Sequence, residues 1–316
     1  MSELGPGVEF DRIRAIASVL GPRAAELGDD CALVPVNGGF LALSVDVSVD
    51  QVHFRREWLT LQEIGWRAAA GALGDLAAVG ADPAGLLVAL TVPPAMTDAE
   101  VVALMDGVGA AASASRAQVL GGDLSAGATL QLAVTVVGSV ARWLGRSGAR
   151  PGDGVWVTGV LGGPRAALQA WQEGRAPDPA AREAFAAPAP RLDTGRWLAA
   201  AGAHAMLDIS DGLAGDAAHL AASSAVRVEV DLARLPMHPS LGPRESRDAI
   251  LMAAQGGEDY ELLAAMPREF GEAEAAACLA ATGVALTRIG TVEAGEGARF
   301  TLAGEVIALQ GYNHFQ

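Results

Sequence analysis

The chain of 316 residues contains no lysine, and all 22 of its basic residues are arginine. A Walker A phosphate loop, the strand lysine of protein kinases and a Schiff base with a substrate each require a lysine side chain. The sequence therefore excludes these three kinds of chemistry.

Cysteine is nearly absent, because only Cys31 and Cys278 occur. Two isolated cysteines form neither a disulfide scaffold nor a zinc site, and such usage is typical of a reducing compartment. The sequence also lacks a signal-peptide pattern and any uninterrupted apolar run of bilayer length. We therefore expect a soluble, cytoplasmic protein that has no membrane partner.

Positive charge is scarce as well, since 37 acidic residues outnumber the basic ones and the formal net charge is −15. Without a basic field the chain has nothing to attract the phosphate backbone of a nucleic acid or an anionic membrane. An anionic small substrate needs cations to approach such a protein. The hydrophobic fraction of 51% is ample for a large core, and the length suggests two domains.

One apolar stretch contains an isolated acid, Asp75. Between Arg67 and Asp98 the sequence has no base and only two acids, Asp75 and Asp82. Apolar residues recur there at helical spacing, which predicts a helix over about 60–79 that carries Asp75 into packed surroundings. A buried carboxylate is costly unless it is paired, hydrogen-bonded or bound to a metal. The alternative is that Asp75 caps a neighbouring loop.

Strand-like and helical segments alternate along the whole chain, which predicts an α/β (α+β) fold. The expected strands include 31–36, 40–47, 84–92, 119–123, 130–140, 155–158, 205–209, 226–232 and 262–266. We expect segment 130–140 near a sheet edge or a subunit interface, and the Pro/Ala-rich segment 174–190 as a long surface excursion. The Arg/Gly/Pro-rich segment 141–154 predicts a boundary between domains 1–141 and 142–316.

A recurring pattern places acids at strand ends or glycine turns. These acids are Asp30, Asp46, Asp123, Asp208 and Asp211, with Asp75 on the predicted helix. If they converge, each pair of charges about 4 Å apart repels by about 4 kcal/mol at an effective dielectric near 20, so bound cations or raised pKa values are required. Because the donors are all oxygens, the expected cation is Mg²⁺ and not zinc. The alternative is a set of scattered caps and turn residues.

Three further features are candidates for ligand contact. Gly121-Gly122-Asp123 is a possible phosphate or metal loop, since glycines let backbone N–H groups approach an oxyanion. Arg146 lies in the polar linker, where it either clamps a phosphate or is solvated. His53 follows a strand close to Asp46, and it is the histidine we favour for substrate contact.

Taken in order, nine segments resemble thiamine-monophosphate kinase over nearly the whole chain. They are GDDCA (28–32), SVD (44–46), HF (53–54), DLAAVGADP (75–83), GGD (121–123), RSGARPGD (146–153), DISDGL (208–213), GGEDYE (256–261) and GYNHF (311–315). The first and fourth also occur, more loosely, in the wider superfamily of ATP-dependent synthetases that act on aminoimidazole ribonucleotide precursors and on selenide.

This resemblance implies ATP-dependent phosphorylation of thiamine monophosphate to thiamine diphosphate. It also implies two mixed-sheet domains and a homodimer built through the N-terminal sheets. By their matched positions, the residues expected to hold several Mg²⁺ ions are Asp30, Ser44, Val45, Asp46, Asp75, Asp123, Asp208 and Asp211. The ATP-binding positions are Gly122, Asp123, Arg146 and Ser210, and the substrate-binding positions are His53, Glu258 and Tyr312.

The implied mechanism is direct in-line transfer, which mainly needs alignment and charge neutralisation. An acceptor phosphate is already ionised, so we assign no residue as acid or base. The chain departs from the family at Val45, where a threonine is usual and where only the backbone carbonyl remains as a ligand. The alternatives are another synthetase of the superfamily, of the aminoimidazole ribonucleotide or selenophosphate type, or a nucleotide-binding relative without turnover.

Overall fold

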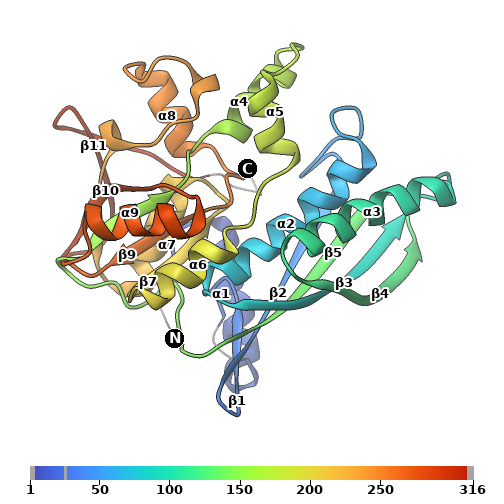
Figure 1. Ribbon diagram of the computed structural model, residues 1–316, viewed down its shortest axis with the longest axis horizontal. Coiled ribbons are helices and arrows are strands. Elements are labelled where there is room, and N and C mark those ends of the chain that lie inside the picture. The colour runs from blue at the N-terminus through green and yellow to red at the C-terminus, as the bar shows by residue number, and fades with distance from the viewer. Residues whose placement is uncertain (1–3, 25–26, 312–316) are drawn as a thin grey trace.

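The computed structural model describes residues 4–24 and 27–311, which form two mixed sheets with helices packed against them (Figure 1). The five-stranded sheet has the order β1-β2-β5-β3-β4, and only its β3–β4 pair is parallel. Its strands are β1 (Ala32–Val36), β2 (Gly39–Val49), β3 (Asp82–Val92), β4 (Gln118–Ala126) and β5 (Gln131–Val140).

The seven-stranded sheet has the order β12-β11-β8-β10-β6-β9-β7. Its strands are β6 (Gly154–Thr158), β7 (Ala205–Ile209), β8 (Arg227–Asp231), β9 (Glu261–Met266), β10 (Leu286–Glu293), β11 (Gly297–Leu302) and β12 (Glu305–Ile307). Strands β6, β7 and β9 are buried along their whole length, as expected for strands covered on both faces.

The helices are α1 (Val8–Leu20), α2 (Leu61–Ala78), α3 (Asp98–Ala114), α4 (Gly163–Gln172), α5 (Pro179–Ala186), α6 (Leu192–Ala200), α7 (Leu213–Ser224), α8 (Arg247–Gln255) and α9 (Glu272–Thr282). Short 3₁₀ turns cover Gly21–Arg23, Leu232–Arg234 and Pro239–Leu241. Within the described part of the chain, no helix is both long and apolar enough to cross a bilayer.

The predicted helix around Asp75 is α2, and it begins with a capping box. The Thr60 side chain accepts a hydrogen bond from the Glu63 backbone, and the Glu63 side chain accepts one from the Thr60 backbone. These two bonds satisfy N–H groups that a helix start otherwise leaves without partners. The prediction of a helix over 60–79 is therefore confirmed.

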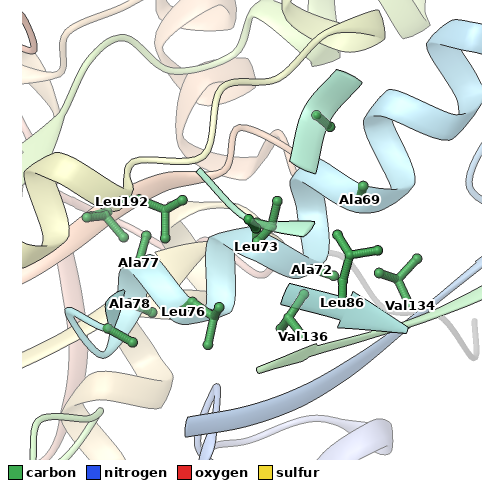
Figure 2. Packing of buried hydrophobic residues seen from close by; sticks show 14 of the residues in the cluster. Ala69, Ala72, Leu73, Leu76, Ala77, Ala78, Leu86, Val134, Val136 and Leu192 are labelled. Carbon is green, nitrogen blue, oxygen red and sulfur yellow. The ribbon is translucent and has the colours of Figure 1, made fainter. Parts of the chain in front are cut away.

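Helix α2 is buried between the two halves of the molecule (Figure 1). In Figure 2, Ala72 and Leu76 lie toward Leu86 and Val136 of the five-stranded sheet, while Ala77 lies near the side chains around Leu192. Two close approaches depend on glycine. A Cβ on Gly65 would lie 1.9 Å from the carbonyl oxygen of Leu104 in α3, and one on Gly195 of α6 would lie 2.1 Å from the carbonyl oxygen of Ala77. The same buried cluster contains residues from both halves, so α2 packs against both of them.

The structure corrects two expectations about segments. Segment 130–140 is the central strand β5, so the sheet-edge alternative is wrong, since it pairs with β2 on one side and β3 on the other. The alternative of a position near a subunit interface stays a prediction. Buried and less buried residues alternate along β5 because Leu132, Val134 and Val136 face the helices while the intervening residues face away from them. Segment 174–190 is also not a surface excursion, because it contains α5, which begins at the N-cap Asp178 and buries Phe185.

Candidate active site

A cavity of about 640 Å³ lies between the two halves of the molecule, and α2 forms part of its wall. Loop 28–30, the end of β2 and residues of α1 and α2 line it from the N-terminal half. Arg146, the starts of α4 and α7, Phe185 and loop 255–260 complete the lining from the other side. The cavity thus collects segments that are far apart in the sequence.

Three carboxylates from distant segments meet in this cavity. Asp30 precedes β1, Asp75 lies on α2, and Asp208 lies near the end of β7. One carboxylate oxygen of each lies within 4.8 Å of the other two, and Asp30 and Asp208 are buried. The reading of these acids as scattered caps is therefore wrong.

Two residues of β2 point toward the same cluster. Ser44 pairs with Val136 and Asp46 with Val134 of β5, and both valines are buried against the helices. Because directly paired residues share a sheet face, Ser44 and Asp46 face α2. The Ser44 hydroxyl donates a hydrogen bond of 2.6 Å to Asp75 Oδ2.

Burial and mutual repulsion shift the pKa values of this cluster. Burial, followed by the charges of Asp46 and Asp208, raises the pKa of Asp75 well above its ordinary value. Burial and the charge of Asp30 raise the pKa of Asp208 in the same way. Groups in this state either hold protons or share a cation.

Arg146 is the basic residue that touches the cluster, and it is buried, not solvated. Its side chain is 14% exposed and forms an ion pair with Asp30, with Nε 3.0 Å from Oδ1. The Arg146 backbone N–H donates a bond of 3.1 Å to Asp29 Oδ1. Burial and the charge of Asp30 raise the pKa of Asp29 to about 6, against the opposing charge of Arg146. One arginine thus neutralises only part of the negative charge gathered here.

A second polar group lies in the cavity around Glu258, and it includes a residue that sequence reasoning missed. Arg67 of α2 is buried and forms an ion pair with Glu258. The Arg67 guanidinium lies 3.9 Å from the centre of the Phe185 ring and donates to the Phe185 carbonyl. Glu258 has φ of 70° and Tyr260 has φ of 50°, a backbone conformation that costs energy for residues other than glycine. The contacts of Arg67 hold this strained turn in place.

His53 also lines the cavity, where its Nδ1 accepts a hydrogen bond of 3.1 Å from the Val49 backbone. The predicted site residues that line the cavity are Asp30, Ser44, Val45, Asp46, His53, Asp75, Arg146, Asp208, Ser210, Asp211 and Glu258. Tyr312 falls outside the described residues.

Gly122 and Asp123 do not join the cavity of their own chain. They lie on β4, the edge strand farthest from β2. Asp123 pairs with the exposed Ala89, so its side chain is on the sheet face that the helices leave uncovered, opposite to Asp46. The expectation that the candidate site residues converge in one cavity is therefore wrong, within a single chain, for Gly122 and Asp123.

The donor set suits a hard divalent cation. The ligands offered by Asp30, Asp75, Asp208, Asp46 and Ser44 are all oxygens, which Mg²⁺ prefers. Asp30 Oδ2 is buried without a hydrogen-bond partner among the described residues, as expected of an atom whose partner is a bound ion. The fold and this cavity define an α/β protein with an acid-rich cavity whose oxygen donors suit a divalent cation.

Comparisons with known proteins identify the family. Residues 28–140 match the family model "AIR synthase related protein, N-terminal domain" and residues 150–303 match "AIR synthase related protein, C-terminal domain". The chain is 33% identical to the thiamine-monophosphate kinase of Aquifex aeolicus, covering 100% of this chain and 99% of that one. It is 36% identical to the enzyme of that name from Escherichia coli K12, covering 97% and 95%.

Solved structures agree with this assignment. A structure described as "AaThiL complexed with AMPPCP and TMP" has a TM-score of 0.87 at 32% identity and covers 98% of this chain and 97% of its own. The hydrogenase maturation protein HypE of E. coli, at 19% identity and a TM-score of 0.71, shares the fold alone. The chain belongs to the thiamine-monophosphate kinase family.

Proposed function

We propose that this protein transfers the terminal phosphate of ATP to thiamine monophosphate and so forms thiamine diphosphate. The observation that carries the proposal is the cavity that gathers Asp30, Asp46, Asp75, Asp208 and Asp211 with Arg146, in a chain alignable over nearly its full length with thiamine-monophosphate kinases. A related structure, 32% identical, is described as a complex with AMPPCP and TMP, which supports the pairing of a nucleotide with this substrate.

The proposed metal ligands are the cavity oxygens of Asp30, Ser44, Val45, Asp46, Asp75, Asp208 and Asp211. Bound Mg²⁺ would neutralise the charge of the phosphates and hold donor and acceptor in line. Val45 would contribute through its backbone carbonyl, since its side chain has no ligand atom. Burial, together with the repulsion between the half-buried Asp75 and the buried Asp208, raises the pKa of Asp75 and so supports this assignment.

The chain's own residues would orient the two substrates. Arg146 and Ser210 are the proposed ATP contacts, and the ion pair with Asp30 fixes the Arg146 guanidinium beside the metal ligands. Glu258 and His53 are the proposed contacts for thiamine monophosphate, because both line the cavity and fall on the positions that the resemblance assigns to the substrate. Tyr312 stays a proposed substrate contact on the resemblance alone. No acid or base is needed, because the acceptor phosphate is already ionised.

We further propose a homodimer that forms through the uncovered face of the five-stranded sheet. Val45, Val47 and Leu87 are exposed on this face by 60%, 47% and 41% in the single chain, and apolar patches of this kind are typical of interfaces. Asp123 lies on the same face, so Gly122 and Asp123 would serve the cavity of a second copy and not their own. The division into domains 1–141 and 142–316 and a cytoplasmic location also remain proposals, the latter supported by two buried, free cysteines.

The rival synthetases of the superfamily fit less well. A selenophosphate-type reaction normally uses a reactive cysteine, whereas Cys31 is buried beside Asp75, and burial raises the pKa of its thiol. A thiol in this state is inert.

The deciding experiment measures ADP and thiamine diphosphate from purified protein, ATP, Mg²⁺ and thiamine monophosphate. We expect equal amounts of both products, and neither product when Mg²⁺ is removed by a chelator. ATP binding without ADP would identify a relative that has lost turnover. ADP release only with formylglycinamidine ribonucleotide or selenide would assign the chain to another reaction.

A further inference from the structure

A second group of metal-binding side chains lies in the same cavity, at the start of α7. Asp216 and His219 are three residues apart on α7, and Asp211 comes two residues before the helix. One possible ligand atom of each lies within 4.8 Å of the other two. All three residues line the cavity, so an ion that enters the cavity reaches them directly.

The surroundings of Asp216 point to a ligand that the chain itself does not supply. Asp216 is only 2% exposed, and its Oδ2 has no hydrogen-bond partner among the described residues. A buried carboxylate oxygen without a partner is costly whether it carries a charge or a proton. A bound cation removes this cost, because it takes the oxygen as a ligand.

His219 is held rigidly at the same place. It is 5% exposed, and the ring of Phe10 in α1 stacks on it with the ring centres 4.0 Å apart. Gly5 lies against the Nδ1 edge of the ring, where a Cβ would come within 1.9 Å of Nδ1, so Nε2 is the nitrogen left for a metal. A ligand ring fixed in this way loses little freedom when it binds a metal.

We propose that Asp211, Asp216 and His219 bind one divalent transition-metal ion, of the Mn²⁺ or Zn²⁺ class, so that Asp211 of the proposed metal ligands belongs to this second site and not to the cluster of Asp30, Asp75 and Asp208. An imidazole nitrogen favours these ions over Mg²⁺, whereas the other cluster offers oxygen only. Three protein ligands leave coordination positions for water or for an oxygen of a ligand in the cavity. The binding does not depend on the proposed kinase activity, so it is testable without nucleotide.

The test counts Mn²⁺ bound to the metal-free full chain by electron paramagnetic resonance in a large excess of Mg²⁺. We expect the wild type to retain one Mn²⁺ per chain, and His219→Asn and Asp216→Asn each to bind it at least tenfold more weakly. The matched control is His204→Asn, since His204 lies outside the cavity lining and pairs with Asp153 at 2.9 Å. The proposal is overturned if the wild type retains no Mn²⁺ against Mg²⁺, or if His219→Asn binds Mn²⁺ as the wild type does.

A second measurement covers the case in which the His219 variant does not fold. The imidazoles of a His53→Asn chain are labelled with ¹⁵N and titrated with Zn²⁺, because His219 is then the remaining histidine of the described cavity lining. We expect one imidazole to shift strongly at one equivalent of Zn²⁺. If none shifts, the site does not exist.

Discussion

Asp75 lies where side chains from β2, β7 and loop 28–30 meet, and α2 fixes its position. We expect Asp75→Asn to lower turnover of thiamine monophosphate by at least about 100-fold at ordinary Mg²⁺ concentrations, because a shared metal ligand is lost. The control is Asp82→Asn, which changes the other acid of this apolar stretch, an exposed residue paired with Arg196. Steady-state kinetics check both variants, and near-wild-type turnover of Asp75→Asn would remove Asp75 from the metal site.

Arg67 supports the strained turn that presents Glu258 to the cavity. We expect Arg67→Lys to raise the KM for thiamine monophosphate by about tenfold while the KM for ATP stays within a factor of two, because lysine keeps the charge but not the planar stack on Phe185. Arg182→Lys, at a half-exposed pair with Glu63, is the matched control. Equal rises in both KM values would mean that Arg67 acts on the whole cavity.

The sequence could identify Asp75 because an acid isolated in an apolar helix needs a partner from elsewhere. It could not identify Arg67, since an arginine on a helix is ordinarily solvated and its partner Glu258 lies 191 positions further along the chain. Asp216 was missed for a related reason, because one acid on a helix shows neither its burial nor the atoms around it. The sheet face that carries the Asp123 side chain depends on how the strands pair, and no local sequence pattern shows that pairing.

Helices α2 and α3 approach so closely that a side chain at Gly65 would collide with backbone atoms. We expect Gly65→Ala to lower the free energy of unfolding by about 1–3 kcal/mol, the usual cost of overpacking. Gly109→Ala in α3, where an added Cβ meets nothing within 4 Å, should instead raise it by about 0.5–1 kcal/mol through helix propensity. Urea unfolding measures both changes in the free energy of unfolding, which should have opposite signs. Equal changes in the two variants would contradict this account of the packing.

Elements with strong local signals were predictable. Helix α2 has a capping box and a long apolar pattern, and β7 has an apolar run interrupted by Asp208 alone, so both were found with accurate bounds. Strand β5 was found, but the sheet-edge alternative for it was wrong, because alternation indicates that one face is open and not where a strand lies in its sheet. Helix α5 was missed because proline and alanine dominate segment 174–190, although a proline at the first position of a helix is favourable.

Without bound metal, the acidic cluster in the cavity lowers the free energy of unfolding by an amount that depends on pH. The folded-state pKa of Asp75 is raised, so the folded chain binds more protons than the unfolded chain, and stability falls as pH rises above the unfolded value of about 4. We therefore expect Asp75→Asn to be more stable than the wild type in EDTA at pH 8, by a margin that shrinks toward pH 5. Denaturant unfolding at both pH values measures this margin, and each unit of pKa shift corresponds to about 1.4 kcal/mol. If the stability advantage of Asp75→Asn instead grows toward acid pH, the pKa of Asp75 is lowered in the folded state and not raised.

Assembly is testable on the uncovered sheet face. We expect Leu87→Asp to turn the proposed dimer into a monomer in light scattering and to lower turnover strongly, because Asp123 would no longer reach a second copy. Val102→Asp, at a position 67% exposed on α3, should remain a dimer with normal turnover. A wild type that is monomeric and fully active would refute both the dimer and the role of Asp123.

Helix α2 also fixes a length. Arg67 and Asp75 are eight residues apart on one rigid rod, which sets them about 12 Å apart along its axis. One end contacts the turn around Glu258 and the other carries Asp75, so the spacing would set the distance between the proposed site for a ring and the proposed site for a phosphate. If both proposed sites hold, a compound whose ring and phosphate are spaced differently would fit only one of them.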